Sequence, residues 1–137
     1  MQPVKSLCTL IVLAFVILIA SACSGNSSPT AAVVSASASI TNLERAGWQA
    51  RSDAGMPNTV SGVRQTGYLV VVSPSHTTID IQFFGSASDA LSEIHAAQGR
   101  LNRFHGSTIA NALVFAHPSG QTPISADLDQ KLASLLR

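Results

Sequence analysis

Residues 68–84, YLVVVSPSHTTIDIQFF, decide the fold. The first part, YLVVVS (68–73), is aromatic and β-branched and too short for a helix, so it predicts a strand. The segment PSH (74–76) predicts a turn, and TTIDIQFF (77–84) predicts a second strand. Because the connection is short, the two strands should form an antiparallel hairpin.

The second strand of this hairpin alternates between apolar and polar residues. Its apolar face should hold Ile79, Ile81 and Phe83. Its polar face should hold Asp80 and Gln82. One side of the sheet should therefore face a core and the other should be polar.

Upstream of the hairpin, two shorter elements are predicted. SITNLERAG (39–47) is typical of a short helix, which Ser39 or Thr41 can cap. WQARSDA (48–54) alternates with a period of two and predicts a strand with one polar face. Residues 60–67 fit either a loop or an irregular strand.

Downstream, two amphipathic helices enclose one more strand. A helix should follow the Ser86 cap, and its apolar stripe is Ala87, Ala90, Leu91, Ile94 and Ala97. STIANALVFA (107–116) predicts the last strand. Ser125 should cap a final helix over 126–137. That helix needs a docking surface, because it carries four leucines on one face: Leu128, Leu132, Leu135 and Leu136.

Together these elements predict the order α-β-β-β-α-β-α in a single domain over residues 40–137. Strands with one polar face and amphipathic helices favour the α+β class. We expect a small two-layer sandwich, in which a mainly antiparallel sheet carries its helices on one face.

The charge balance argues against nucleic-acid binding. All seven acidic residues and seven of the eight basic residues lie beyond residue 22, so a chain cut there is neutral with its histidines uncharged. A neutral domain has no long-range attraction for a phosphate backbone. We therefore expect no nucleic-acid partner.

The first 22 residues have the pattern of an export signal. Lys5 and the amino terminus give a weakly positive start, and an unbroken apolar run covers Leu7 to Ala20. This run has the length of a signal-peptide core and falls short of the roughly 20 residues that span a bilayer as a helix. An uncleaved signal anchor would need a longer apolar core.

Small residues and a cysteine close this apolar run, in the sequence Ala20-Ser-Ala22-Cys23. The pattern resembles the lipobox of bacterial lipoproteins over residues 1 to about 24. The resemblance implies that a diacylglyceryl group is attached to Cys23 and that a dedicated peptidase cuts between Ala22 and Cys23. Ala20 stands where the family most often has leucine. Cys8 lies at the start of the apolar run, with no signal core before it.

The same residues leave a second interpretation open, because Ala20-Ser-Ala22 also forms an A-x-A site for the ordinary secretory peptidase. That cut would release a secreted protein. With lipid on Cys23, the domain would stay on the outer face of the cell membrane, or on an outer membrane if the cell has one. Residues 23–39, rich in Ser and Ala and uncharged after Cys23, predict a flexible tether.

No metal or cofactor site is predicted. The four histidines lack the H-x-H or H-x-x-x-H spacing that aims two rings at one ion: His76, His95, His105 and His117. Because His105 and His117 flank one predicted strand, they should lie roughly 40 Å apart unless the chain bends between them. His76 in a turn and His117 at a strand end occupy ordinary exposed places.

No catalytic motif is present either. The chain lacks a G-x-S-x-G elbow, and the cysteine left after cleavage should be acylated. The available carboxylates have ordinary explanations at helix starts or on polar faces: Glu44, Asp53, Asp80, Asp89, Glu93, Asp127 and Asp129. Most of the aromatic residues should be core: Trp48, Tyr68, Phe83, Phe84, Phe104 and Phe115.

The sequence therefore favours a membrane-anchored, non-enzymatic lipoprotein domain that binds an envelope protein or a small molecule, or that has a structural role in the envelope. Two alternatives stay open: an envelope hydrolase whose site is assembled by the fold, and a carrier for an apolar molecule. Converging polar groups in a pocket would favour the hydrolase, an apolar cavity the carrier, and an exposed aromatic patch the protein binder.

Overall fold

A computed structural model describes residues 32–137 except 54 and 56. The predicted signal peptide, the predicted cleavage position between Ala22 and Cys23, and most of the predicted tether lie outside the described residues. Residues Ala31–Arg137 form a compact unit. Both apolar cores lie inside it, so it should fold without residues 1–30. No helix in this described part is long and apolar enough to cross a bilayer.

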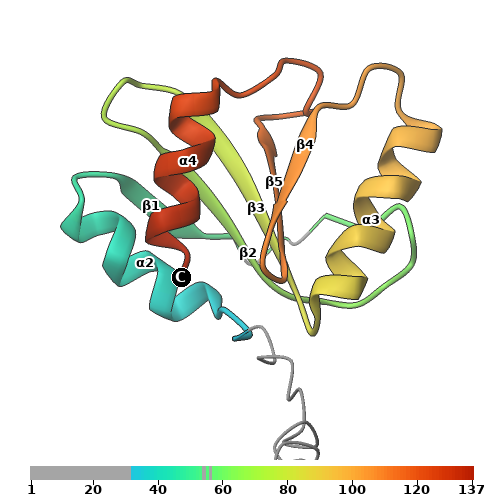
Figure 1. The fold of residues 1–137 in the computed structure, drawn as a ribbon, viewed down its shortest axis with the longest axis horizontal. Helices are drawn as coiled ribbons and strands as arrows, with labels where there is room; N and C mark the ends of the chain where they lie inside the picture. Colours follow the sequence, from blue (N-terminus) through green and yellow to red (C-terminus); the bar gives the residue numbers. More distant parts are fainter. Residues whose placement is uncertain (1–31, 54, 56) are drawn as a thin grey trace, which may run out of the picture. The chain divides into compact units, whose positions relative to one another are not determined.

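The unit is built on one antiparallel sheet, as predicted. Its helices are α2 (Ala36–Arg45), α3 (Ala87–Arg100) and α4 (Ala126–Leu135). Its strands are β1 (Gln49–Ser52), β2 (Gln65–Val72), β3 (Thr78–Phe84), β4 (Gly106–Ile109) and β5 (Ala112–Ala116). The strands lie in the order β1-β2-β3-β5-β4, and every neighbouring pair is antiparallel (Figure 1). The α+β class is confirmed.

The predicted last strand over 107–116 is a hairpin of two strands. Ile109 pairs with Ala112, and between them Ala110 has a left-handed backbone (φ 51°). The expected wide separation of His105 and His117 is therefore wrong. The chain reverses, and the pairing of Gly106 with Phe115 brings the two flanking segments to the same end of the sheet.

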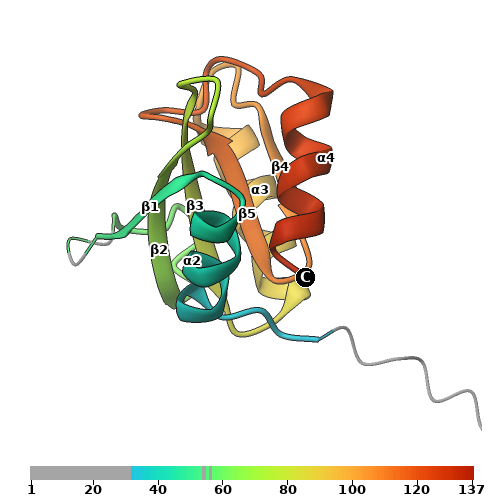
Figure 2. The ribbon, with the colours of Figure 1, turned by 90° about the vertical axis from the view of Figure 1, so that its left-hand side faces the viewer.

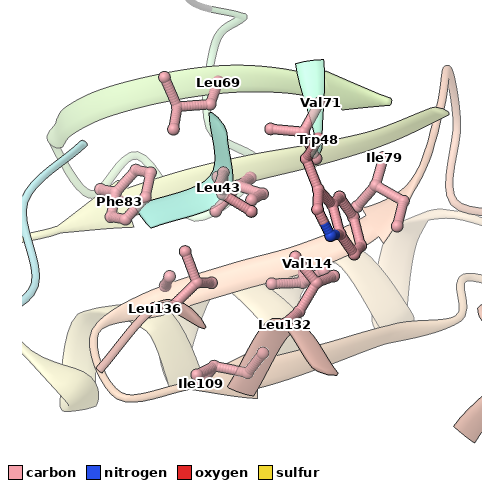
Figure 3. Close-up of a cluster of buried hydrophobic side chains, with 12 residues drawn as sticks. Leu43, Trp48, Leu69, Val71, Ile79, Phe83, Ile109, Val114, Leu132 and Leu136 are labelled. Atoms are coloured by element: carbon pink, nitrogen blue, oxygen red, sulfur yellow. The ribbon is translucent and has the colours of Figure 1, made fainter. Parts of the chain in front are cut away.

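One face of the sheet carries α2 and α4, which lie next to each other in Figures 1 and 2. Figure 3 shows the core between these helices and the strands, with Leu43 and Trp48 among side chains of the sheet. Leu132 of α4 and Leu136, the residue that follows the helix, are buried there. The predicted docking of the C-terminal helix is confirmed.

The expectation that all helices share one face is wrong, because α3 packs on the opposite face. Its buried residues Ala90, Ile94 and Ala97 belong to a second core. The strands supply that core with Phe84, Leu113 and Phe115, which alternate with residues of the first core. Both faces of β3 and β5 are therefore apolar enough to bind a helix.

The domain begins earlier than residue 40. Ser35, and not Ser39 or Thr41, caps α2, and the Ser39 hydroxyl is buried and donates to the Ser35 carbonyl at 2.9 Å. Before the cap, the Val34 N–H donates to Asn111 Oδ1 at 2.7 Å, and the Asn111 amide donates to the Val34 carbonyl at 2.9 Å. The predicted tether therefore ends before Val34.

Helix α3 starts at its predicted cap, where the Ser86 hydroxyl accepts from the Asp89 N–H at 3.1 Å. Its predicted stripe is wrong at one place, because Leu91 is 46% exposed. Glu93 is buried instead. The reason is the segment before β2, which packs over this side of the helix and hydrogen-bonds the Glu93 carboxylate.

Candidate functional site

The candidate site lies on the sheet face that α2 and α4 leave uncovered. Tyr68 pairs with Gln82, and Val70 pairs with Asp80, so these four side chains lie on one face. Sequence alternation predicts this polar face correctly but not its burial. Asp80 is 1% and Gln82 5% exposed.

A histidine covers the buried aspartate. Nδ1 of His117 lies 3.0 Å from both carboxylate oxygens of Asp80. The local cause is the register of β3 and β5, in which Asp80 pairs with Phe115, two residues before His117. The His117 N–H donates to the Thr78 carbonyl at 3.1 Å and fixes the segment. The His117 side chain is 46% exposed, and its second ring nitrogen is left for another partner.

Burial controls the electrostatics of this pair. It raises the pKa of the Asp80 carboxyl above its usual 3.8, while hydrogen bonds with His117 and Tyr68 oppose the rise. Burial and the adjacent Asp80 charge also raise the pKa of the Tyr68 hydroxyl. Tyr68 is therefore a neutral neighbour of Asp80, and three titratable groups on β2, β3 and the end of β5, two of them buried, lie close together.

Beside this cluster lies a cavity of about 220 Å³, here called the inner cavity. Its lining is mainly apolar and includes Val60, Leu101, Phe104, Leu113 and Phe115. Two polar groups of the strands, Tyr68 and Gln82, also line it. Gln82 is 5% exposed as a residue, and its amide makes no hydrogen bond to the described residues but stays accessible at the cavity. Among the described residues, the buried side-chain atom without a partner is Gln65 Oε1, which does not line this cavity.

The walls of the inner cavity are held in place by specific contacts. The Glu93 carboxylate accepts from the Val60 N–H at 2.8 Å and the Ser61 N–H at 2.9 Å, and the Ser61 hydroxyl also donates to it. On the opposite wall the Phe104 ring packs against Gly120, where an added Cβ would lie 2.4 Å from it. The cavity is therefore pre-formed rather than created by a loose loop.

A second hollow, here called the groove, has a volume of about 390 Å³. It is lined by Gln49, Ala50, Arg51, Val70, Val72, Thr78 and His117. On this face of the sheet, the Val70–Asp80 pair lies between two other pairs of β2 and β3. The Val72–Thr78 pair is on one side of it and the Tyr68–Gln82 pair on the other. Residues two apart on a strand are about 7 Å apart, so the two hollows flank the Asp80–His117 pair.

Comparisons with known proteins give no family for the chain. No family model matches it, and no similar curated protein or solved structure is found. The arguments for function therefore come from the chemistry of the two hollows.

The structure leaves the other predicted candidates apart. His76 lies in the β2–β3 turn, and His95 and His105 are exposed on other elements. In the described part of the chain, no three His, Cys, Asp or Glu side chains are grouped to hold a metal ion. The aromatic side chains of the described residues, most of which were expected in the core, are all buried: Trp48, Tyr68, Phe83, Phe84, Phe104 and Phe115.

Sequence reasoning missed the partnership of Asp80 and His117. It placed Asp80 on a solvated polar face and His117 at an exposed strand end. The two meet only because β5 pairs with β3 and not with β2. The sequence does show that Asp80 lies within one strongly apolar strand and that His117 follows another. This pattern does not tell which residues of the two strands pair.

Proposed function

We propose that this chain is the precursor of a bacterial lipoprotein whose domain, anchored by lipid on Cys23, binds a small molecule without catalysing a reaction. The small residues Ala20 to Ala22 before Cys23 support the anchoring. So does the absence of any other cysteine beyond Cys8 in the sequence. Two or more acyl chains give stable membrane attachment, which a single chain does not. The folded domain then begins near Val34, about ten residues beyond the lipid.

The observation that carries the binding proposal is the Gln82 amide. The residue is 5% exposed, and its amide makes no hydrogen bond to the described residues, so its donors and its acceptor are left for a molecule in the cavity. Gln82 lines a mainly apolar cavity together with the Tyr68 hydroxyl. A ligand with one donor–acceptor group on an apolar body would supply the missing partner.

The charges around the inner cavity indicate a neutral ligand. Among the described residues, Glu93 is the one charged side chain that lines it, and Asp80 lies two residues from Gln82 on the same face of β3. Both are acids, so a bound anion would be repelled. At about 220 Å³ the cavity is smaller than the roughly 300–1,000 Å³ of sites for drug-sized ligands. The ligand class is therefore a single-ring or short-chain neutral molecule.

Three probes of similar size test this proposal: benzamide, benzoate and benzylamine. Residues 24–137, labelled with ¹⁵N, would be titrated with each and followed by NMR. We expect saturable shifts around Gln82 with benzamide and not with benzoate. Gln82→Leu should abolish them, whereas Gln98→Leu on the exposed side of α3 should not. Equal binding of benzoate or tighter binding of benzylamine than of benzamide, or no binding of benzamide, would reject the neutral-ligand cavity.

An envelope hydrolase is the second candidate, because Asp80 orients His117 as an acid orients a general base. Its test is the hydrolysis of p-nitrophenyl acetate. Turnover that disappears in His117→Gln and persists in His105→Gln would favour the hydrolase over the binding domain.

A further inference from the structure

The groove beside His117 has a different chemistry from that of the inner cavity. Its charged side chains, Arg51 and His117, are both basic. Its other polar side chains, Gln49 and Thr78, can also donate hydrogen bonds. We propose that the groove binds a single anionic group, a carboxylate or a phosphate, between the guanidinium of Arg51 and the ring of His117, which line it together.

Asp80 prepares His117 for this role. Both carboxylate oxygens of Asp80 lie 3.0 Å from Nδ1 of His117, so the buried carboxylate fixes the orientation of the ring. A protonated imidazole carries an N–H on each nitrogen, and with Nδ1 engaged by Asp80 it has Nε2–H to offer a ligand. The arrangement resembles a charge-assisted donor held in position before its ligand arrives.

Arg51 reaches the groove from the edge strand. It pairs with Val70, and Val70 pairs on its other side with Asp80. With strands about 4.8 Å apart, Arg51 and Asp80 lie roughly 10 Å apart across one row, a distance that an arginine side chain can cover. In the described residues the ion pairs are His117–Asp80 and Lys131–Asp127, so Arg51 is in neither. Its guanidinium remains available for a ligand.

The other titratable groups near His117 are acids or neutral. Asp53, at the end of β1, influences Asp80 but does not line the groove, and its carboxylate accepts from the Gly55 N–H at 3.0 Å. Tyr68, on β2, is a neighbour of Asp80, and its pKa is raised above the ordinary value. An anion bound in the groove would therefore contact Arg51 and His117 and not these acids.

The test uses residues 24–137 with ¹⁵N-labelled histidine, titrated with inorganic phosphate and with acetate at constant ionic strength. The ring nitrogens of His117 should show a saturable shift. Arg51→Gln should weaken binding about tenfold, the effect of losing one charge-assisted hydrogen bond. The matched control, Arg64→Gln, changes an exposed arginine outside both hollows and should leave the affinity unchanged.

Two further arms complete the experiment. Binding to vesicles of phosphatidylglycerol is compared with binding to vesicles of phosphatidylcholine, to show whether the anion is a lipid headgroup or a free molecule. Binding of an anion from either source supports the site. No saturable shift of His117, or equal loss in Arg51→Gln and Arg64→Gln, would overturn it. Benzamide binding in Arg51→Gln should stay unchanged, so failure of the groove and failure of the inner cavity are distinguishable.

Discussion

His117 and Asp80 form a pair in which a half-exposed ring covers a buried carboxylate, with Nδ1 3.0 Å from each oxygen. The pair separates two hollows of opposite electrostatic character. Toward Gln82 the nearby charges are acidic, and toward Arg51 they are basic. The buried carboxyl of Asp80 thus contributes to both environments. Its protonation state should affect the free energy of unfolding of the domain.

Asp80→Asn should change how stability depends on pH. Burial raises the folded pKa of Asp80 above 3.8, so the folded state holds this proton more tightly than the unfolded state. As the pH rises through the interval from 3.8 to the raised value, the wild type should therefore lose stability relative to Asp80→Asn. Urea midpoints of both chains between about pH 3 and 6 measure this. A gain in relative wild-type stability would mean that the pair lowers this pKa.

Tyr68 should resist ionisation. It is the only tyrosine of the chain, and burial and Asp80 raise its pKa above the ordinary 10.0. Absorbance of tyrosinate near 295 nm should therefore stay absent at pH 10–11 while the domain is folded, and should rise with unfolding at higher pH. In Asp80→Asn the ionisation should begin at lower pH, because one cause of the shift is removed. Ordinary titration near pH 10 in the folded wild type would contradict the burial of Tyr68 beside Asp80.

Leu132→Ala tests the docking of α4. Leu132 is 0% exposed in the core that also holds Trp48, so its truncation should destabilise the domain by about 2–5 kcal/mol. Trp48 is the only tryptophan, and its fluorescence reports unfolding in urea. The control is Leu91→Ala, at a 46% exposed leucine of α3, which should stay within about 0.5 kcal/mol of wild type. Equal effects would show that α4 is a detachable tail.

Local signals explain why much of the fold could be predicted. The β2–β3 hairpin follows from β-branched residues around a polar turn, and α3 and α4 follow from serine caps before apolar stripes. The β4–β5 hairpin was missed because its turn, at Ala110 and Asn111, lies inside an apolar run. Asn111 has the capacity to bond the Val34 backbone and the Phe84 carbonyl, but these partners are distant in sequence.

The candidate site depended on pairing that the sequence does not reveal. Gln82 and Asp80 alternate like solvent-facing residues, and their burial comes from α3 and from segments on either side of it in the chain. His117 meets Asp80 through the register of β3 with β5, which places Phe115 opposite Asp80. Composition and spacing carry no information on such a contact.

The lipid anchor is the central claim, and the mass of the mature N-terminal peptide tests it most directly. Membranes of cells that express the full chain would be extracted, and the peptide that begins at Cys23 analysed by mass spectrometry. We predict a chain cut after Ala22 with diacylglyceryl on Cys23, and its loss from the membrane fraction in Cys23→Ala but not in the matched Cys8→Ala. A soluble wild-type chain that begins with an unmodified Cys23 would contradict the account and identify a secreted protein.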